Sequence, residues 1–340
     1  MILAIESSCD ESALALFNPK VGLTRELISS QAAQHQKYGG VVPDLASRMH
    51  LSALPLLLES FQADLPHVTQ IAVTRGPGLL PCLSLGVSMA RALALSLRCP
   101  LVGINHLRAH AHSPFIPLHR EAPDHFLQNR EALLPHLGLI VSGGNTLLIE
   151  INTSLQLTIL GRTVDDAAGE AFDKGAKLLG LPYPGGALIE QLAQKGSVAK
   201  FNFPRGIPEK ADLRFSFSGL KTALRYQLET MSDTEVATEL PNLCASYQEA
   251  ILGQLLAKTQ AALNRQRYRS LGLSGGVANN QTLRTQLTKL AHQAGVKMLT
   301  AEAAHCGDNA GMIAFAAWCE TSLPTDDAVT PAPALLIDAL

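Results

Sequence analysis

The stretch Leu137-Gly-Leu-Ile-Val-Ser-Gly-Gly-Asn145 leads an apolar run into a pair of glycines, and Leu271-Gly-Leu-Ser-Gly-Gly-Val-Ala-Asn-Asn280 repeats the pattern. Each stretch predicts a buried strand that ends in a turn, Ser142-Gly143-Gly144 in the first case and Ser274-Gly275-Gly276 in the second. Glycine tolerates positive φ and lets backbone amides approach an anion closely. The two turns therefore predict anion-binding backbone.

A third turn, Glu6-Ser-Ser-Cys-Asp-Glu-Ser12, separates the apolar runs Ile2–Ile5 and Ala13–Leu16. Runs with strand character then alternate with runs of helical spacing, as at Ile71–Thr74 and Leu83–Leu97. Such alternation predicts an α/β fold in which part of the sheet is parallel. Three such turns, far apart in the chain, predict one phosphate or nucleotide site between two lobes.

Changes in composition predict the domain organisation. Residues 1–113 form an N-terminal lobe, and residues 136–324 form a C-terminal lobe with an irregular and helical insertion at about 181–245. The proline-rich residues 114–135 are the expected crossing segment, and residues 325–340 are expected to be a loose tail at the surface. Further helices are expected at Asp44–Phe61 (with a kink or a break at Pro55), Val164–Gly180, Ser246–Leu263 and Gly311–Cys319.

The composition is that of an ordinary globular protein. Of its 340 residues, 47% are hydrophobic and 16% are charged, and the formal net charge is −2. A nucleic-acid partner would therefore need a local basic patch or a helper protein. The six cysteines form no Cys-x-x-Cys pair, and the sequence contains neither a signal peptide nor an uncharged run of about 18 apolar residues. These features predict a cytoplasmic protein with reduced thiols and no membrane span.

A pair of histidines provides the first candidate for chemistry. His106 and His110 are four residues apart in a predicted helix, so both imidazoles can reach one metal ion. Asp308, which precedes another predicted helix, is the candidate carboxylate, and two histidines with one carboxylate suit iron or zinc. A zinc metalloprotease is excluded because its motif requires glutamate directly after the first histidine, where this chain has Leu107. Coincidental spacing remains the alternative interpretation.

Acidic residues provide the second candidate. Asp10 and Glu11 occupy the first turn, where they could orient a nucleophile, hold a metal-bound water or cap the turn. The stretch Asp165-Asp-Ala-Ala-Gly-Glu-Ala-Phe-Asp-Lys174 places four acids among small residues, which favours close packing over a solvated face. We interpret it as a candidate ribose or metal-water site.

The order of these motifs along residues 1–318 resembles the universal tRNA N6-adenosine threonylcarbamoyltransferase family in its bacterial type, once misnamed a glycoprotein endopeptidase. The resemblance rests on Ile5–Ser12, Tyr38–Arg48, Gly76–Gly78, His106 with His110, Val141–Gly144, Asp165–Lys174, Tyr183–Gly186, Phe215–Lys221, Ser274–Val277 with Asn280, and Asp308-Asn309. The stretches Asp165–Lys174 and Phe215–Lys221 are the most specific to that family.

The resemblance implies an actin-like, sugar-kinase-like ATPase (ASKHA) fold of two lobes, each with a mixed sheet flanked by helices, and a site in the cleft between them. It also implies an acyltransferase that moves threonylcarbamoyl from threonylcarbamoyl-AMP to N6 of adenosine 37 in tRNAs that read ANN codons. The implied cofactor is one divalent metal, Fe²⁺ or alternatively Zn²⁺, with an adenylate substrate and possibly ATP. The implied partners are tRNA, a shorter relative of the same fold and a P-loop ATPase, without a membrane.

Site residues are carried over by motif. The metal ligands fall on His106, His110 and Asp308. The adenylate contacts fall on Ile140, Val141, Ser142, Gly143, Gly144, Asp173, Gly186, Glu190 and Asn280. We assign Asp10 and Glu11 to positioning or deprotonating the adenosine amine, and the glycine-turn amides to stabilising anionic groups.

Three positions depart from the family pattern. Asn145 stands where the family has histidine, Arg108 stands where an acid lies between the metal histidines, and Ala332–Leu340 replaces a basic, proline-rich end. The first departure is expected to affect substrate orientation, and the last is expected to weaken contacts with tRNA or partners.

Two other functions are compatible with these features. One is a small-molecule kinase or ATPase of the same fold, which would bind nucleotide through Mg²⁺ without imidazoles. The other is a non-catalytic subunit of a tRNA-modifying complex, which would lack bound metal or adenylate.

Overall fold

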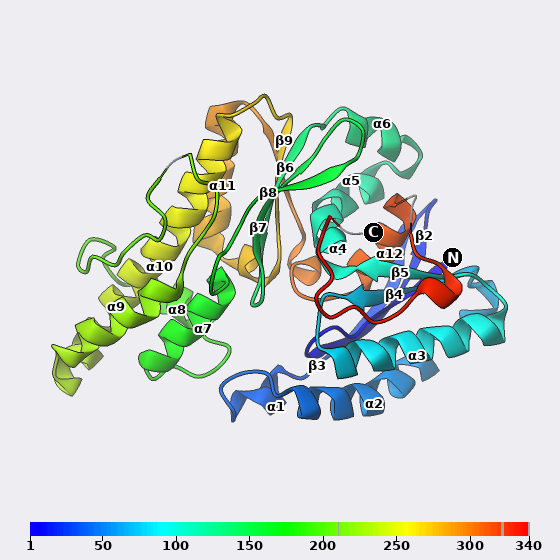
Figure 1. Ribbon diagram of the computed structural model, residues 1–340, viewed down its shortest axis with the longest axis horizontal. Coiled ribbons are helices and arrows are strands. Elements are labelled where there is room, and N and C mark those ends of the chain that lie inside the picture. The colour runs from blue at the N-terminus through cyan, green and yellow to red at the C-terminus, as the bar shows by residue number, and fades with distance from the viewer. Residues whose placement is uncertain (210, 321–322, 339–340) are drawn as a thin grey trace. The chain divides into compact units, whose positions relative to one another are not determined.

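The computed structural model describes residues 1–209, 211–320 and 323–338. The chain forms two compact units, one of Met1–Ala132 with Ala301–Leu340 and the other of Leu133–Thr300 (Figure 1). The first unit therefore consists of both ends of the chain. This grouping differs from the boundaries expected from composition, because the last helix packs on the first two strands rather than with the residues before it.

The first unit is built on a mixed five-stranded sheet of order β3-β2-β1-β4-β5. The strands are β1 (Ile2–Glu6), β2 (Glu11–Asn18), β3 (Gly22–Ser30), β4 (Gln70–Gly76) and β5 (Leu101–Asn105). The first three run antiparallel, whereas β4 and β5 are parallel to β1. Strand β3 has no counterpart in the sequence analysis, because most of its side chains are at least partly exposed and it lacks a clear apolar alternation.

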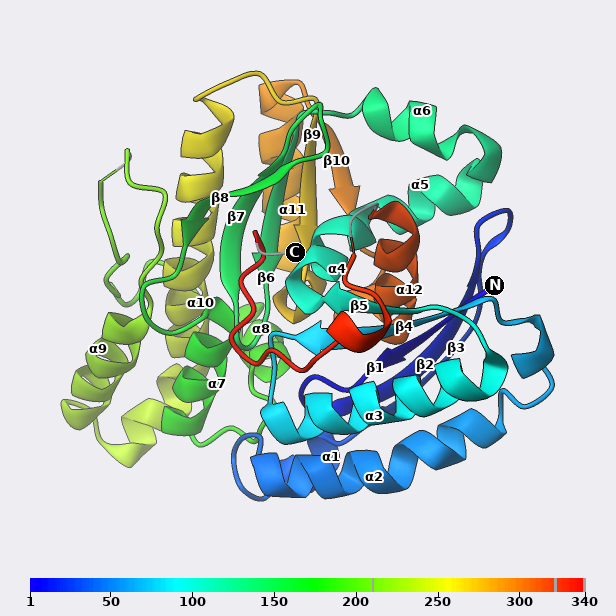
Figure 2. The ribbon, with the colours of Figure 1, turned by 45° about the vertical axis from the view of Figure 1, so that its right-hand side comes forward.

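Helices cover both faces of this sheet. Helices α2 (Pro43–Glu59) and α3 (Leu80–Leu97) enclose a core with the apolar side chains of β1, β2 and β4. Helix α12 (Ala310–Cys319) packs against β1 and β2 and is apolar around its circumference, as expected of a buried helix (Figure 2). Helix α2 continues through Pro55, so the predicted break is wrong.

Helix α3 is the one described helix that is long and apolar enough to cross a membrane by length and composition. A core helix meets the same criteria. One face of α3, including Leu83, Val87 and Ala90, is buried in the core of the first unit.

The chain passes from the first unit to the second between Ala132 and Leu133, within the expected crossing segment of residues 114–135. Most of the residues from 106 to 131 are helical. The helices of this stretch are α4 (His106–His112), α5 (Ile116–Glu121) and α6 (Phe126–Glu131), with short 3₁₀ turns between them. Helix α1 (Ala32–Gln36) lies earlier in the chain, between β3 and α2. Pro114, Pro117 and Pro123 each lie in the first two positions of a helical segment, where proline is well tolerated.

Most described residues of the tail are exposed, as predicted for a surface segment, but the tail is held to the rest of the first unit and is not loose. Val329 and Ile337 are buried, and the amide of Ala332 donates to the carbonyl oxygen of Arg75 at 2.7 Å. The side chain of Arg91 donates to the carbonyl oxygen of Val329 at 2.9 Å. Hydrogen bonds to backbone carbonyl groups therefore hold the tail in place, although its sequence shows no regular hydrophobic periodicity.

The second unit repeats the topology of the first, with a five-stranded sheet of order β10-β9-β6-β7-β8. Strands β6, β7 and β8 run antiparallel, and β9 and β10 are parallel to β6. The strands are β6 (His136–Val141), β7 (Thr146–Ile151), β8 (Leu157–Arg162), β9 (Ser270–Ser274) and β10 (Lys297–Thr300). The repeated strand-turn-strand pattern in the sequence thus corresponds to a repeated sheet.

Five helices complete the second unit. They are α7 (Ala168–Leu178), α8 (Gly186–Ala193), α9 (Ser218–Glu229), α10 (Asp233–Leu263) and α11 (Gln281–Ala294). Helix α10 begins 13 residues before the expected Ser246 and continues through Pro241. Ser232 and Glu235 form a capping box that defines its start. The sequence between α8 and α9 contains no helix among the described residues, as the proline and glycine content predicts.

Candidate functional site

Helix α4 carries the two histidines of the candidate metal site. Strand β5 ends at Asn105, whose side-chain oxygen accepts hydrogen bonds from the amides of Leu107 and Arg108 and so caps the helix. His106 and His110 follow one turn apart, and their rings lie 4.7 Å apart between centroids. The cap therefore starts the helix at the position that places both rings on one face.

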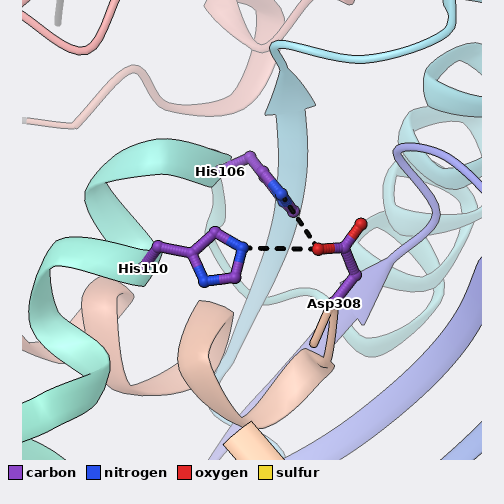
Figure 3. A group of neighbouring side chains, drawn as sticks. All are labelled: His106, His110 and Asp308. Atoms are coloured by element: carbon purple, nitrogen blue, oxygen red, sulfur yellow. Dashed lines mark hydrogen bonds and ion pairs between the residues drawn. The ribbon is translucent and has the colours of Figure 1, made fainter. Parts of the chain in front are cut away.

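Asp308 completes the group from a distant part of the sequence. It lies two residues before α12, and its Oδ1 is 3.3 Å from Nε2 of both His106 and His110 (Figure 3). The three ligand atoms lie within 4.8 Å of one another, the one such group of three or more found in the described residues. Two imidazole nitrogens and one carboxylate oxygen that converge in this way fit iron or zinc.

A buried carboxylate orients the first of these histidines. Glu6 Oε2 lies 3.2 Å from Nδ1 of His106, which leaves Nε2 facing Asp308. Glu6 is itself held by the amide of Ser8 and the hydroxyl of Thr74, each at 2.5 Å. Metal-binding histidines commonly donate their second nitrogen to a carboxylate in this way. This contact is the observation that supports a metal at His106 rather than a simple ion pair.

The charges of the group also fit a cation. Burial would raise the pKa of Asp308, but the positive charge of His106 and the hydrogen bonds from both imidazoles hold it well below its usual range. Burial would lower the pKa of His106, but the charges of Asp308 and Glu6 raise it well above its usual value. Burial lowers the pKa of His110. The pocket thus stabilises a positive charge beside Asp308.

Asp10 and Glu11 lie where β1 turns into β2. Burial, followed by the negative charges of Asp10 and Asp308, raises the pKa of Glu11 to about 9, and Ser30 donates to its Oε1 at 3.1 Å. The contribution of Asp308 places this turn near the histidine group. His50 joins the two sides of the turn, with Nδ1 at 2.6 Å from Ser12 Oγ and Nε2 at 2.9 Å from the Cys9 carbonyl oxygen.

The two glycine turns lie at the same edge of the second sheet. Strands β6 and β9 are parallel neighbours in which Ile140 pairs with Ser274, so their carboxyl ends coincide. In the first turn, the amide of Ser142 donates to the carbonyl oxygen of Asn145 at 2.8 Å, and the amide of Asn145 donates to Ser142 Oγ at 3.0 Å. A Cβ atom on Gly143 or Gly144 would meet open space, so the turn leaves room for a ligand beside its backbone.

The conformational reason for glycine differs between these turns. Gly275 has φ of +90°, and a Cβ there would lie 2.3 Å from the carbonyl oxygen of Val141. Neither Gly143 nor Gly144 has a positive φ. Left-handed backbone therefore requires glycine at Gly275, whereas the open space beside Gly143 and Gly144 leaves their backbone accessible.

The remaining residues assigned to the adenylate already have partners within the second unit. Asp173 Oδ1 accepts from the amide of Gly185 at 2.8 Å, directly before Gly186 begins α8. Glu190 accepts from the amide of Gln281 at 2.7 Å, and Asn280 caps α11 through the amide of Leu283 at 2.9 Å. Ile140 and Val141 are buried strand residues whose side chains face the core.

The contacts of Asp165 in the second unit were not predicted. Asp165 accepts hydrogen bonds from the hydroxyls of Ser216 and Ser218 and from the amides of Phe217 and Ser218. The two most family-specific stretches of the sequence therefore bind each other. In the first unit, Glu6 and His50 were likewise missed as partners of the site, although Glu6 lies in the quoted turn. Their contacts with Ser12, Cys9, Thr74 and His106 join residues 38 or more positions apart, so no local pattern reveals them.

Comparison with known proteins agrees with this arrangement. The family described as tRNA N6-adenosine threonylcarbamoyltransferase matches residues 22–315. A protein of that name from Trichlorobacter lovleyi is 44% identical and covers 97% of this chain and 96% of its own length. One from Thermotoga neapolitana is 41% identical and covers 93% of each chain.

Solved structures with low identity show the fold. HypF in its phosphate- and nucleotide-bound form is 13% identical, with a TM-score of 0.57, over 94% of this chain and 47% of HypF. A ROK family protein from Streptococcus pneumoniae in complex with sucrose is 12% identical, with a TM-score of 0.53, over 93% of this chain and 97% of its own. The architecture is thus the ASKHA fold of actin-like ATPases and sugar kinases. From the family match and the full-length relatives together, the chain belongs to the tRNA N6-adenosine threonylcarbamoyltransferase family.

Proposed function

We propose that this protein transfers the threonylcarbamoyl group of threonylcarbamoyl-AMP to N6 of adenosine 37 in tRNAs that read ANN codons. The observation that carries the proposal is the convergence of His106, His110 and Asp308 in a chain of this family. A kinase of the same fold binds its nucleotide through Mg²⁺, a hard cation that prefers oxygen ligands, and has no use for two buried imidazoles.

One divalent ion, Fe²⁺ or alternatively Zn²⁺, would be held by the two histidines and Asp308. When bound, it would supply Lewis-acid polarisation to an oxygen of the adenylate. Glu6 keeps Nε2 of His106 directed at this position by engaging Nδ1 at 3.2 Å. The role of the chain here is to fix the geometry of the ligands before the substrate arrives.

The adenylate would be held by the second unit. The turn Ser142-Gly143-Gly144 presents exposed backbone at the two glycines, with room for anionic oxygens. Asp173, Gly186, Glu190 and Asn280 stand around the starts of α8 and α11 and would contact the ribose or the adenine. Ile140 and Val141 would contribute backbone atoms alone, because their side chains are buried.

Asp10 and Glu11 would position or deprotonate the adenosine amine. With a pKa raised to about 9, Glu11 holds its own proton at neutral pH. Asp10, whose negative charge contributes to that shift, is the better candidate for accepting a proton from N6. Ser30 and His50 hold this turn in place.

The protein would act in the cytoplasm together with a shorter relative of the same fold and a P-loop ATPase. With a net charge of −2, the isolated chain has no general attraction for tRNA phosphates, which fits a requirement for partner subunits.

Reconstitution tests the proposal. Purified protein is incubated with threonylcarbamoyl-AMP and unmodified tRNA, with and without its partner subunits, and the nucleosides are analysed by mass spectrometry. Formation of threonylcarbamoyladenosine is expected, and it should disappear in Asp308→Asn. A modified nucleoside formed equally well with Asp308→Asn would refute the metal role, and no product with all subunits present would favour a non-catalytic subunit.

A further inference from the structure

Helix α4 also makes polar contacts on the face opposite the two histidines. Because successive residues are rotated by about 100°, Arg108 and His112 lie on the side of the helix opposite His106 and His110. The guanidinium of Arg108 donates through Nε and Nη2 to the two carboxylate oxygens of Glu320, at 2.8 and 2.7 Å. His112 Nε2 lies 2.8 Å from Oε1 of the same carboxylate. All three side chains are almost fully buried.

Glu320 and Asp308 stand at opposite ends of α12. Asp308 precedes the helix by two residues, and Glu320 is its C-terminal cap. Helices α4 and α12 pack against each other, so α12 contacts one face of α4 through Asp308 and the opposite face through Glu320. A rotation of α4 about its axis would move both imidazoles relative to Asp308 and would break the Glu320 contacts at the same time.

The C-terminal tail adds two contacts to the same helix. Asn105, the cap of α4, donates through Nδ2 to the carbonyl oxygen of Leu336 at 2.7 Å. Arg108 donates through Nη1 to the carbonyl oxygen of Ile337 at 3.2 Å. Both views in Figures 1 and 2 show the tail, coloured red, running past β5 and α4.

The tail cannot shift easily at this position. The amide of Gly78 donates to the carbonyl oxygen of Pro333 at 3.1 Å, and a Cβ on Gly76 would overlap the carbonyl group of Ala332. Arg108 and the atypical end of the chain, which depart separately from the family pattern, are therefore in contact with each other.

We propose that Arg108, Glu320 and the tail carbonyls of Leu336 and Ile337 form a positioning clamp that holds α4 in the rotation at which His106 and His110 face Asp308. The clamp residues contact no reacting atom and act through the helix. Loss of the clamp should lower the affinity for the metal, because two ligands on one helix no longer point at the same position when that helix rotates. This inference rests on the metal site of the proposed function.

The test measures zinc binding by the metal-stripped full-length protein in competition with a chelating indicator. Glu320→Gln is expected to weaken zinc binding by about 10–100-fold, the usual effect of losing a contact behind a metal ligand. Arg108→Lys keeps the positive charge but loses the bidentate contact with Glu320, so its affinity for zinc should fall less than that of Glu320→Gln. Truncation after Pro333 removes the two tail carbonyls and should also weaken binding.

Asp64→Asn is the matched control, because it breaks the Arg25–Asp64 ion pair of 3.2 Å in the same unit without touching α4. Its zinc affinity should equal that of the parent. The melting temperature of each metal-stripped variant is recorded as well, since a purely structural role would lower this temperature and leave the affinity of the folded protein unchanged.

The outcomes separate the hypotheses. Parental zinc affinity in Glu320→Gln and Arg108→Lys would overturn the clamp, and parental affinity in the truncated chain would remove the tail from it. If Glu320→Gln does not fold, Arg108→Lys decides. Failure of the parent itself to bind zinc or iron would instead overturn the metal site of the proposed function.

Discussion

The backbone amide of Gly169 donates a hydrogen bond of 3.2 Å to the carbonyl oxygen of Ser142, so helix α7 begins directly against the first glycine turn. A Cβ atom at position 169 would lie 2.6 Å from that oxygen and 2.8 Å from the Cα of Gly143. Glycine is required here for close approach, and the acidic stretch that follows is thereby fixed beside the turn proposed to bind the adenylate.

Gly169→Ala should therefore destabilise the protein by about 1–3 kcal/mol, the usual cost of overpacking, and weaken binding of the adenylate. Urea unfolding and a ligand titration measure the two effects. Gly219→Ala is the matched control, because Gly219 is also the second residue of a helix but a Cβ there meets open space. The control should be neutral or slightly stabilising, and an equal loss in both variants would contradict the packing argument.

The metal ligands should control metal content. The purified protein is expected to carry about one iron or zinc per chain that a chelator removes, and His106→Ala or His110→Ala should lose most of the affinity. Elemental analysis of the dialysed proteins measures this. His292→Gln, at an exposed histidine of α11, should retain the parental content. Full metal content in both alanine variants would place the metal elsewhere.

Asn145 should contribute a neutral hydrogen bond to the substrate. An amide cannot titrate near neutral pH, whereas a histidine can. Asn145→His should therefore be tolerated and should add a titration to the pH dependence of the rate near the usual histidine pKa of about 6.5. Asn145→Ala should leave a polar group of the ligand unpaired and so slow the reaction, with a loss of about 1–3 kcal/mol in transition-state stabilisation. Parental activity in Asn145→Ala would show that this side chain does not contact the substrate.

The Glu320 carboxylate should stabilise the fold in a pH-dependent manner. Burial would raise its pKa, but His112 and Arg108 lower it from 4.5 to about 2. Because the folded pKa is the lower one, the stabilisation is complete above about pH 5 and is lost as the pH falls through 4.5 towards 2. The difference corresponds to about 3 kcal/mol.

Comparison of the parent with Glu320→Gln checks this sign. The difference in their free energies of unfolding should be largest near about pH 6 and should shrink by about pH 3. Denaturant unfolding at the two pH values measures it. A difference that stays constant between them would assign the effect to packing rather than to the charge.

The parts of the fold that the sequence predicts well are local. The turns at Ser142 and Ser274 follow apolar runs, and their strands and glycine pairs are encoded within ten residues of sequence. The spacing of His106 and His110 is equally local, because one helical turn brings them together. Asp308 was predicted as the third ligand because it precedes a predicted helix, and the structure brings the three side chains together.

The parts that the sequence did not predict depend on tertiary contacts. The tail has no periodicity in its sequence, and its described residues 325–338 are held by partners such as Arg75, Arg91 and Asn105. Prolines also made helices difficult to predict from the sequence. Pro241 and Pro55 lie within continuous helices, where neighbouring packing outweighs the lost hydrogen bond. Pro117 is the second residue of a helix in a stretch whose composition alone made it look irregular.

The division of the first unit between the two ends of the chain has a consequence for synthesis. The residues of β1 and β2 that α12 covers leave the ribosome first, and α12 itself follows about 300 residues later, after the whole second unit has been made. All residues of the second unit, Leu133–Thr300, are made before α12, so the apolar residues of β1 and β2 that α12 covers lack this partner until then. Exposed apolar surface of this kind is a target for chaperones and a risk for aggregation. The three proposed metal ligands are together only after Asp308 has been made, so metal binding at the proposed site would follow the synthesis of the second unit.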